Sequence, residues 1–363
     1  MGVFEDIQIH KEIGAIALSS TKLNLRTIIV CGKFSSSMRT ISFHETGIVK
    51  RKWITKLLDP FFSLRYILEE SPDYMLIYNI ENYGSLFLIL SLYFLRLLRS
   101  STKHKIKIII KADTDGGFLE TRNVLFLAAY KLLILFYSKI TRGIIIETTC
   151  GIERISKFVN GKCKLIYLPN GYSSDIFEGN FNAARKQMIM CIANLIPTKN
   201  IESVLRIFYR LSETFKDLQL KIAGQIVDSE YSKKIEATIL QMNLTDKVEI
   251  ISVNGQQLAK LLRESKLTVS TSLVESFGIA RMESLGAGTP VVTYDVGCGA
   301  DFIRFGAIVV PVGDEEGMYK EIVTLLLDKS YWIKKSLDGQ KSSISWDSVV
   351  LKLISIFQND EAA

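Results

Sequence analysis

Short β-branched runs alternate with longer segments of helical periodicity along the whole chain. Because this alternation is typical of parallel sheets with crossover helices, we predict an α/β fold. In the first half of the chain the predicted strands are 26–32, 73–79, 105–112, 142–148 and 163–170. In the second half they are 188–195, 218–224, 247–253, 266–272, 290–296 and 307–313.

A polar stretch with glycine and serine, residues 171–187, separates the two series of strands. The chain of 363 residues also exceeds the size at which one core usually stops growing. We therefore predict two facing Rossmann-like, doubly wound domains, residues 1–170 and 171–345, with a helix at 346–358 that packs back on the first. Ligands of such sheets bind at the carboxyl ends of the strands, so the cleft between the domains is the expected site.

Charge distinguishes the two halves. Residues 1–165 hold 24 basic and 14 acidic side chains, a net charge of +10, and the remainder holds 21 and 24, a net charge of −3. A basic half suggests an anionic partner such as a membrane surface, although solvated surface lysines explain the charge equally well. No nucleic-acid-binding motif accompanies the charge, so nucleic acid is not an expected partner.

The cysteines and the N-terminus indicate the compartment. The five cysteines are scattered, without metal-ligand spacing, as in a reducing environment. The first residues lack the basic and apolar regions of a secretory signal, so we expect a cytoplasmic protein.

Two apolar stretches, residues 85–98 and 124–137, resemble membrane segments. Both are shorter than the ~20 residues that a spanning helix needs, and Arg96 and Lys131 interrupt them. They are either core helices or carry an apolar face that contacts lipid on the inner side of the cell membrane.

The segment 272–292, SLVESFGIARMESLGAGTPVV, carries the most informative chemistry. A predicted strand ends at Ser272, Glu275 lies in the following loop, and Glu283 lies inside the next helix. Two carboxylates flanking a helix N-terminus suit a ligand with a diol at each end and phosphate between, although a helix cap with two solvated glutamates has the same pattern.

The sequence ESFGIARME, followed by SLGAGTPVV, resembles the E-x7-E signature of the retaining glycosyltransferases of family 4, and we expect a prokaryotic or archaeal member. The resemblance covers residues 165–355 well, whereas the first half matches only in its order of strands and helices. Further landmarks fall in the family's order: Pro169-Asn170-Gly171, Asp175, Phe177, Pro197-x-Lys199, Ala223-Gly224, Gly297 to Asp301 and Pro311-x-Gly313-Asp314.

The resemblance implies a GT-B fold and transfer of a hexose, with retention of configuration, from a nucleotide sugar such as a UDP-sugar to a lipid-linked or surface glycan. It also implies roles for individual residues. Glu283 would hold the ribose, Glu275 would contact the transferred sugar, and Lys199 would neutralise the diphosphate. Backbone amides of Ser276, Phe277 and Gly278 would bind the sugar and phosphate.

The chain departs from the family in two places. Asn194 stands where the family usually has an arginine, so one phosphate contact is missing or comes from elsewhere. Arg281 is one candidate for it, although surface pairing is the commoner use of a helical arginine. Asp113 stands near the family's usual histidine, where it either positions a substrate or forms an Asx turn with Gly116 and Gly117.

Other interpretations remain open. Asp113-x-Asp115 is also the pattern by which another glycosyltransferase fold binds Mg²⁺ or Mn²⁺, although that fold does not explain Glu275 and Glu283. A different enzyme of the same architecture, such as a nucleotide-sugar epimerase or a sugar phosphorylase, and a non-catalytic binding subunit are the remaining alternatives. We expect no metal and no cofactor, with the nucleotide sugar as a co-substrate.

Overall fold

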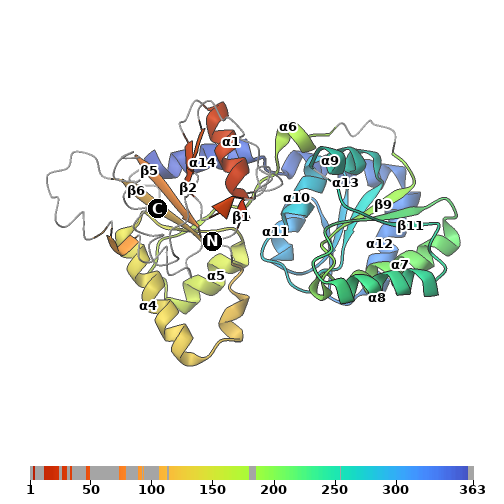
Figure 1. Cartoon of the computed structure of the whole chain (residues 1–363), viewed down its shortest axis with the longest axis horizontal. Coiled ribbons are helices and arrows are strands. Elements are labelled where there is room, and N and C mark those ends of the chain that lie inside the picture. Colours follow the sequence, from red (N-terminus) through yellow and green to blue (C-terminus); the bar gives the residue numbers. More distant parts are fainter. Residues whose placement is uncertain are drawn as a thin grey trace. The chain divides into compact units, whose positions relative to one another are not determined.

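The computed structural model describes residues 3–4, 12–23, 27–30, 33–34, 46–49, 73–78, 89–91, 93, 106–112, 114–179, 185–253 and 255–358. The chain divides into two compact units (Figure 1). Unit 1 comprises Met1–Pro169 and Val349–Ala363, and unit 2 comprises Asn170–Ser348.

Unit 2 is built on a six-stranded parallel sheet of order β11-β10-β9-β12-β13-β14. Its strands are β9 (Met188–Ile192), β10 (Gln219–Ala223), β11 (Val248–Ile251), β12 (Leu267–Ser270), β13 (Val291–Tyr294) and β14 (Ile308–Val310). From β9 the chain moves outward to β10 and β11, then returns to β12 on the other side of β9. The strand order therefore reverses between β9 and β12, the topological switch point at which ligands of such sheets bind.

Helices cover both faces of this sheet (Figure 1). Helices α7 (Ile201–Thr214), α8 (Ser229–Gln241) and α12 (Glu315–Leu327) pack in one apolar cluster. Helices α9 (Gly255–Glu264), α10 (Ile279–Gly286) and α11 (Gly299–Arg304) contribute to the second. Alternate residues of β9 enter different clusters, Ile189 the first and Met190 the second, because successive strand side chains point to opposite faces.

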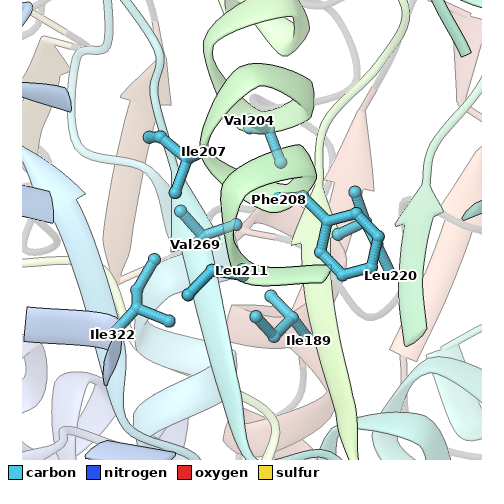
Figure 2. Close-up of a pocket in the computed structure, with 8 residues that line it drawn as sticks. All are labelled: Ile189, Val204, Ile207, Phe208, Leu211, Leu220, Val269 and Ile322. Carbon is cyan, nitrogen blue, oxygen red and sulfur yellow. The ribbon is translucent and has the colours of Figure 1, made fainter. Parts of the chain in front are cut away.

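The core beneath α7 contains a small cavity (Figure 2). Its volume is about 10 Å³ and its lining is entirely apolar: Ile189, Val204, Ile207, Phe208, Leu211, Leu220, Val269 and Ile322. A space of this size holds one water at most, and apolar cavities stay dry. The cavity is therefore a packing void and not a ligand site.

Unit 1 contains a four-stranded parallel sheet of order β5-β6-β7-β8 and two short parallel pairs, β1 with β3 and β2 with β4. The strands are β1 (Val3–Phe4), β2 (Thr27–Val30), β3 (Lys33–Phe34), β4 (Thr46–Val49), β5 (Tyr74–Tyr78), β6 (Lys107–Ala112), β7 (Ile144–Ile146) and β8 (Leu165–Tyr167). The helices include α1 (Glu12–Lys22), η2 (Gly117–Glu120), α4 (Val124–Ile140) and α5 (Thr149–Phe158). Two Rossmann-like α/β domains are confirmed, and every predicted strand segment contains an observed strand.

Three further elements complete unit 2: α6 (Ser174–Phe177), the 3-10 turn η3 (Pro197–Lys199) and α13 (Lys329–Ser342). The last helix, α14 (Trp346–Gln358), begins in unit 2 and belongs to unit 1 from Val349 onward. Near its end the Phe357 carbonyl accepts a hydrogen bond from Lys107 Nζ at 3.0 Å, and the Phe357 ring lies 4.7 Å from that of Tyr74. These contacts join the end of α14 to strands β5 and β6.

The predicted apolar stretch 124–137 lies within α4. One face of this helix buries Tyr130, Ile134 and Tyr137, while Leu125 is 84% and Leu132 69% exposed. Within the described ranges, no helix is long and apolar enough to span a membrane. The other stretch, 85–98, lies outside the described residues except for 89–91 and 93.

Candidate functional site

The switch point of unit 2 brings Lys199 and Glu275 together. Lys199 ends the turn η3 after β9, and Glu275 lies in the loop after β12. Because β9 and β12 are neighbours, both loops emerge at the same edge of the sheet. The Lys199 Nζ lies 2.5 Å from Glu275 Oε1, and the two side chains are 21% and 17% exposed. An ion pair that water still reaches therefore bridges the position where a doubly wound sheet binds its ligand.

Three hydrogen bonds join these two loops. Asn200 adopts a left-handed conformation, with φ of 49°, and its Nδ2 donates to the Thr271 carbonyl at 3.3 Å. Thr271 Oγ1 donates to the Asn200 carbonyl at 2.8 Å, and the Leu273 amide donates to the Thr198 carbonyl at 2.8 Å. These bonds from the Asn200 and Thr271 side chains and the Leu273 amide therefore hold the loop of Lys199 against the loop of Glu275.

The loop between Glu275 and α10 is anchored in the core by Phe277. This side chain is buried and its ring centroid lies 5.1 Å from that of Phe302. Ser276 is exposed, and Gly278, with φ of 83°, is the N-cap of α10. The Phe277 side chain therefore packs inside the domain, and only its backbone is left for a ligand.

Glu283 lies in α10 and is 5% exposed. Asn194 follows β9 and is exposed, and its Oδ1 accepts a hydrogen bond from the Gln225 amide at 3.1 Å. The Asn194 side chain thereby joins the carboxyl ends of β9 and β10.

The acidic pair of unit 1 is described only at its second residue. Asp113 lies outside the described residues. Asp115 Oδ1 accepts from the Gly117 amide at 3.0 Å, which is an Asx turn, and Oδ2 pairs with Arg154 at 3.2 Å. In the part of the chain with described positions, no group of three or more His, Cys, Asp or Glu side chains could hold a metal ion.

The expectation that Arg281 forms a surface ion pair is wrong. The side chain is 3% exposed, and its guanidinium carbon lies 4.0 Å from the centroid of the Phe302 ring. Burial lowers the pKa of Arg281 to about 10. Residues 281–286 of α10 are all buried, so an arginine in this helix has little access to water.

A second loop, absent from the predicted site, lies against the first. It follows β13 and contains Gly297 and Cys298, which have φ of 57° and 64°. A Cβ on Gly297 would lie 2.7 Å from the Glu275 carbonyl oxygen, so the two loops are in close backbone contact. The Gly299 amide donates to Asp295 Oδ1 at 3.1 Å, which closes this loop at the start of α11.

The two Rossmann-like domains have the fold of solved GT-B glycosyltransferases. A solved structure with a similar fold is HepE of Anabaena in complex with UDP and glucose, with a TM-score of 0.69 and 12% sequence identity. The similarity covers 97% of this chain and 98% of that one.

The sequence comparisons point to a family for the second half of the chain. Residues 173–338 match the model of the family described as glycosyl transferases group 1. An uncharacterized glycosyltransferase of Methanocaldococcus jannaschii is 26% identical over 216 residues, which cover 54% of each chain. The poly(glycerol-phosphate) alpha-glucosyltransferase of Bacillus subtilis is 32% identical over 151 residues, covering 40% of this chain and 22% of that protein. The matched part thus spans about half or less of these curated relatives.

Proposed function

We propose that this protein is a retaining glycosyltransferase that moves a hexose from a nucleotide diphosphate sugar to a hydroxyl group. The observation that carries the proposal is the Lys199–Glu275 pair at the switch point, next to the N-terminus of α10. An ammonium group and a helix N-terminus both favour a diphosphate at this edge of the sheet. The match of residues 173–338 to glycosyl transferases group 1 supports the same assignment.

Both members of the ion pair change partners when the donor binds. The diphosphate draws the Lys199 ammonium to itself, and Glu275 is then free to accept hydrogen bonds from hydroxyl groups of the sugar. Glu283 holds the ribose from within α10. As the bond to the sugar breaks, negative charge grows on the departing diphosphate, and Lys199 stabilises it more strongly than it stabilises the intact donor.

The remaining parts of the proposal concern proton transfer and the acceptor. In a retaining reaction the leaving phosphate oxygen takes the acceptor proton on the same face of the sugar. Asp113 is then left to position the acceptor hydroxyl or the sugar. These roles require no metal ion, and unchanged turnover in excess EDTA is the expected result.

A panel of nucleotide sugars tests the reaction. UDP-sugars come first because HepE was crystallised with UDP and glucose. Mass spectrometry should detect a glycosylated acceptor with one donor class, and NMR of the anomeric proton should show retained configuration. Donor binding without transfer or hydrolysis would refute the transferase and favour the alternative of a non-catalytic binding subunit. A product of inverted configuration would refute the retaining mechanism.

We also propose that the acceptor lies at the cytoplasmic face of a membrane, as a lipid-linked glycan. Support comes from the +10 charge of residues 1–165 and from the exposed apolar side chains of α4, Val124, Leu125 and Leu132. Both features favour an anionic lipid surface. Co-sedimentation with anionic vesicles should be strong at low salt and fade at high salt. Failure to sediment at low salt would refute the membrane contact without affecting the transferase assignment.

A further inference from the structure

One arginine holds two loops of the proposed donor site. Arg281 Nη2 donates to the carbonyl oxygen of Phe277, in the loop before α10. Its Nη1 donates to the carbonyl oxygen of Val296 at 3.2 Å, in the loop after β13, and lies 3.4 Å from Thr293 Oγ1. Because a guanidinium is planar with donors in fixed directions, this single side chain orients both peptide groups.

The amides of these two peptide groups turn away from Arg281. The described chain contains no cis peptide bond, and in a trans peptide the C=O and N–H groups point in opposite directions. With the carbonyls of Phe277 and Val296 directed at the guanidinium, the N–H groups of Gly278 and Gly297 point away from it. Neither amide donates to an acceptor among the described residues. Gly297 is buried, where an unpaired N–H group is costly.

Neither glycine has room for a side chain, Gly278 because of the guanidinium and Gly297 because of the backbone of the other loop. A Cβ on Gly278 would lie 2.6 Å from Arg281 Nε, which is itself buried without a hydrogen-bond acceptor among the described atoms. Gly297 is closed in by the Glu275 carbonyl. The positive charge of Arg281 therefore lies directly behind the loop that precedes α10.

We propose that Arg281 is a positioning residue, which holds the amides of Gly278 and Gly297 to donate to anionic oxygens of the donor diphosphate. The proposal rests on the proposed function and deepens it. Backbone amides at a helix N-terminus bind anions, as the Gly278 amide at the N-cap of α10 can, and a fixed cation behind the loop adds to the attraction. The side chain is almost wholly buried, so it acts through the two peptides and not by touching the phosphate.

Inorganic pyrophosphate is the probe, because it has the two linked phosphates of the donor without base or sugar. Isothermal titration calorimetry measures its affinity for wild type, Arg281→Lys and Arg281→Met. The matched control is Arg185→Lys. Arg185 also donates to backbone carbonyls, those of Leu262 at 2.8 Å and Gly288 at 3.0 Å, and burial lowers its pKa to about 10 as well. It lies close to Trp332, away from the switch point.

We expect both Arg281 variants to bind pyrophosphate at least tenfold more weakly, and Arg185→Lys to bind it as wild type does. In wild type, NMR should show the amide resonances of Gly278 and Gly297 shifting on titration. In transfer assays with a nucleotide-sugar donor, Arg281→Lys should lower kcat more than it raises KM, because the amides stabilise the negative charge that grows on the leaving group. A general loss of folded protein would instead lower active-site concentration and leave KM unchanged.

Wild-type affinity in a folded Arg281→Lys protein would overturn the proposal, as would amide resonances that do not respond to pyrophosphate. If the variants fail to fold, the amide titration of wild type decides. The outcome is separable from the proposed function. Sugar transfer by wild type with an unaffected Arg281→Lys refutes only the role of Arg281, whereas pyrophosphate binding at both amides without any transfer refutes only the transferase.

Discussion

The Lys199–Glu275 ion pair can stabilise the two loops, contact the donor, or do both. Exchanging Lys199 for Met and Glu275 for Gln, singly and together, distinguishes these roles. Both side chains are partly exposed, so the pair should contribute near the upper end of the 0.2–1 kcal/mol of a surface pair and less than the ~3 kcal/mol of a fully buried charged hydrogen bond. About 1 kcal/mol is the expected stability loss in either single variant. For a domain of this size it lowers Tm by roughly 2–4 °C.

Turnover should respond differently from stability. If Lys199 stabilises the departing diphosphate, its loss raises the activation free energy by about 1.5–3 kcal/mol, which is about a 10- to 150-fold decrease in kcat. The double variant leaves no unpaired charge, so it should regain most of the lost Tm. It should not regain turnover, because neither group is present to contact the donor.

Thermal melts and initial rates on the same preparations measure both quantities. Lys221→Met is the matched control, because Lys221 is 27% exposed and pairs with Glu249 on the neighbouring strand. It should keep wild-type turnover. If the double variant recovers turnover together with stability, the ion pair only supports the loops, and the assignment of Lys199 to the phosphate is wrong.

Three further changes test other parts of unit 2. Glu283→Ala should weaken donor binding by the ~1.5–3 kcal/mol of a charge-assisted hydrogen bond, measured by calorimetry; unchanged affinity with a normal melt would reject its contact with the ribose. Gly278→Ala should lower Tm and donor affinity together, because φ is 83° and the new Cβ would press on Arg281, and wild-type values in both assays would contradict the described packing. Glu315→Gln should lower Tm at pH 7 and not at pH well below the ordinary glutamate pKa of about 4.3. Burial opposes the charged form of Glu315, but hydrogen bonds from Arg206 and Ser203 outweigh it and lower the pKa of Glu315. The charged carboxylate therefore stabilises the fold above the unfolded-state pKa, and this stabilisation is lost as the pH falls through the folded-state pKa. An equal Tm difference between variant and wild type at both pH values would refute this.

The strands of both sheets could be predicted because buried parallel strands need continuous β-branched runs, which the sequence shows. The strands β1, β3 and β4 were not predicted, because their sequences, VF, KF and TGIV, contain no continuous β-branched run. The contact between Lys199 and Glu275 was not predictable from their spacing, because it depends on β9 and β12 being neighbours. Arg281 was misjudged because periodicity alone does not show how completely a helix is enclosed.

The route of the chain between the two units has a consequence for protein synthesis. Unit 2 is continuous, whereas unit 1 takes α14 from beyond the end of unit 2. On the ribosome, unit 2 can therefore complete its sheet before unit 1 has received its last helix, although domains generally fold in the order in which they are made. Until α14 emerges, the Lys107 and Tyr74 side chains on β6 and β5 lack their contacts with Phe357. Unit 1 therefore stays incomplete until α14 has been synthesised, and it is at this stage that a chaperone that binds apolar surface would bind it.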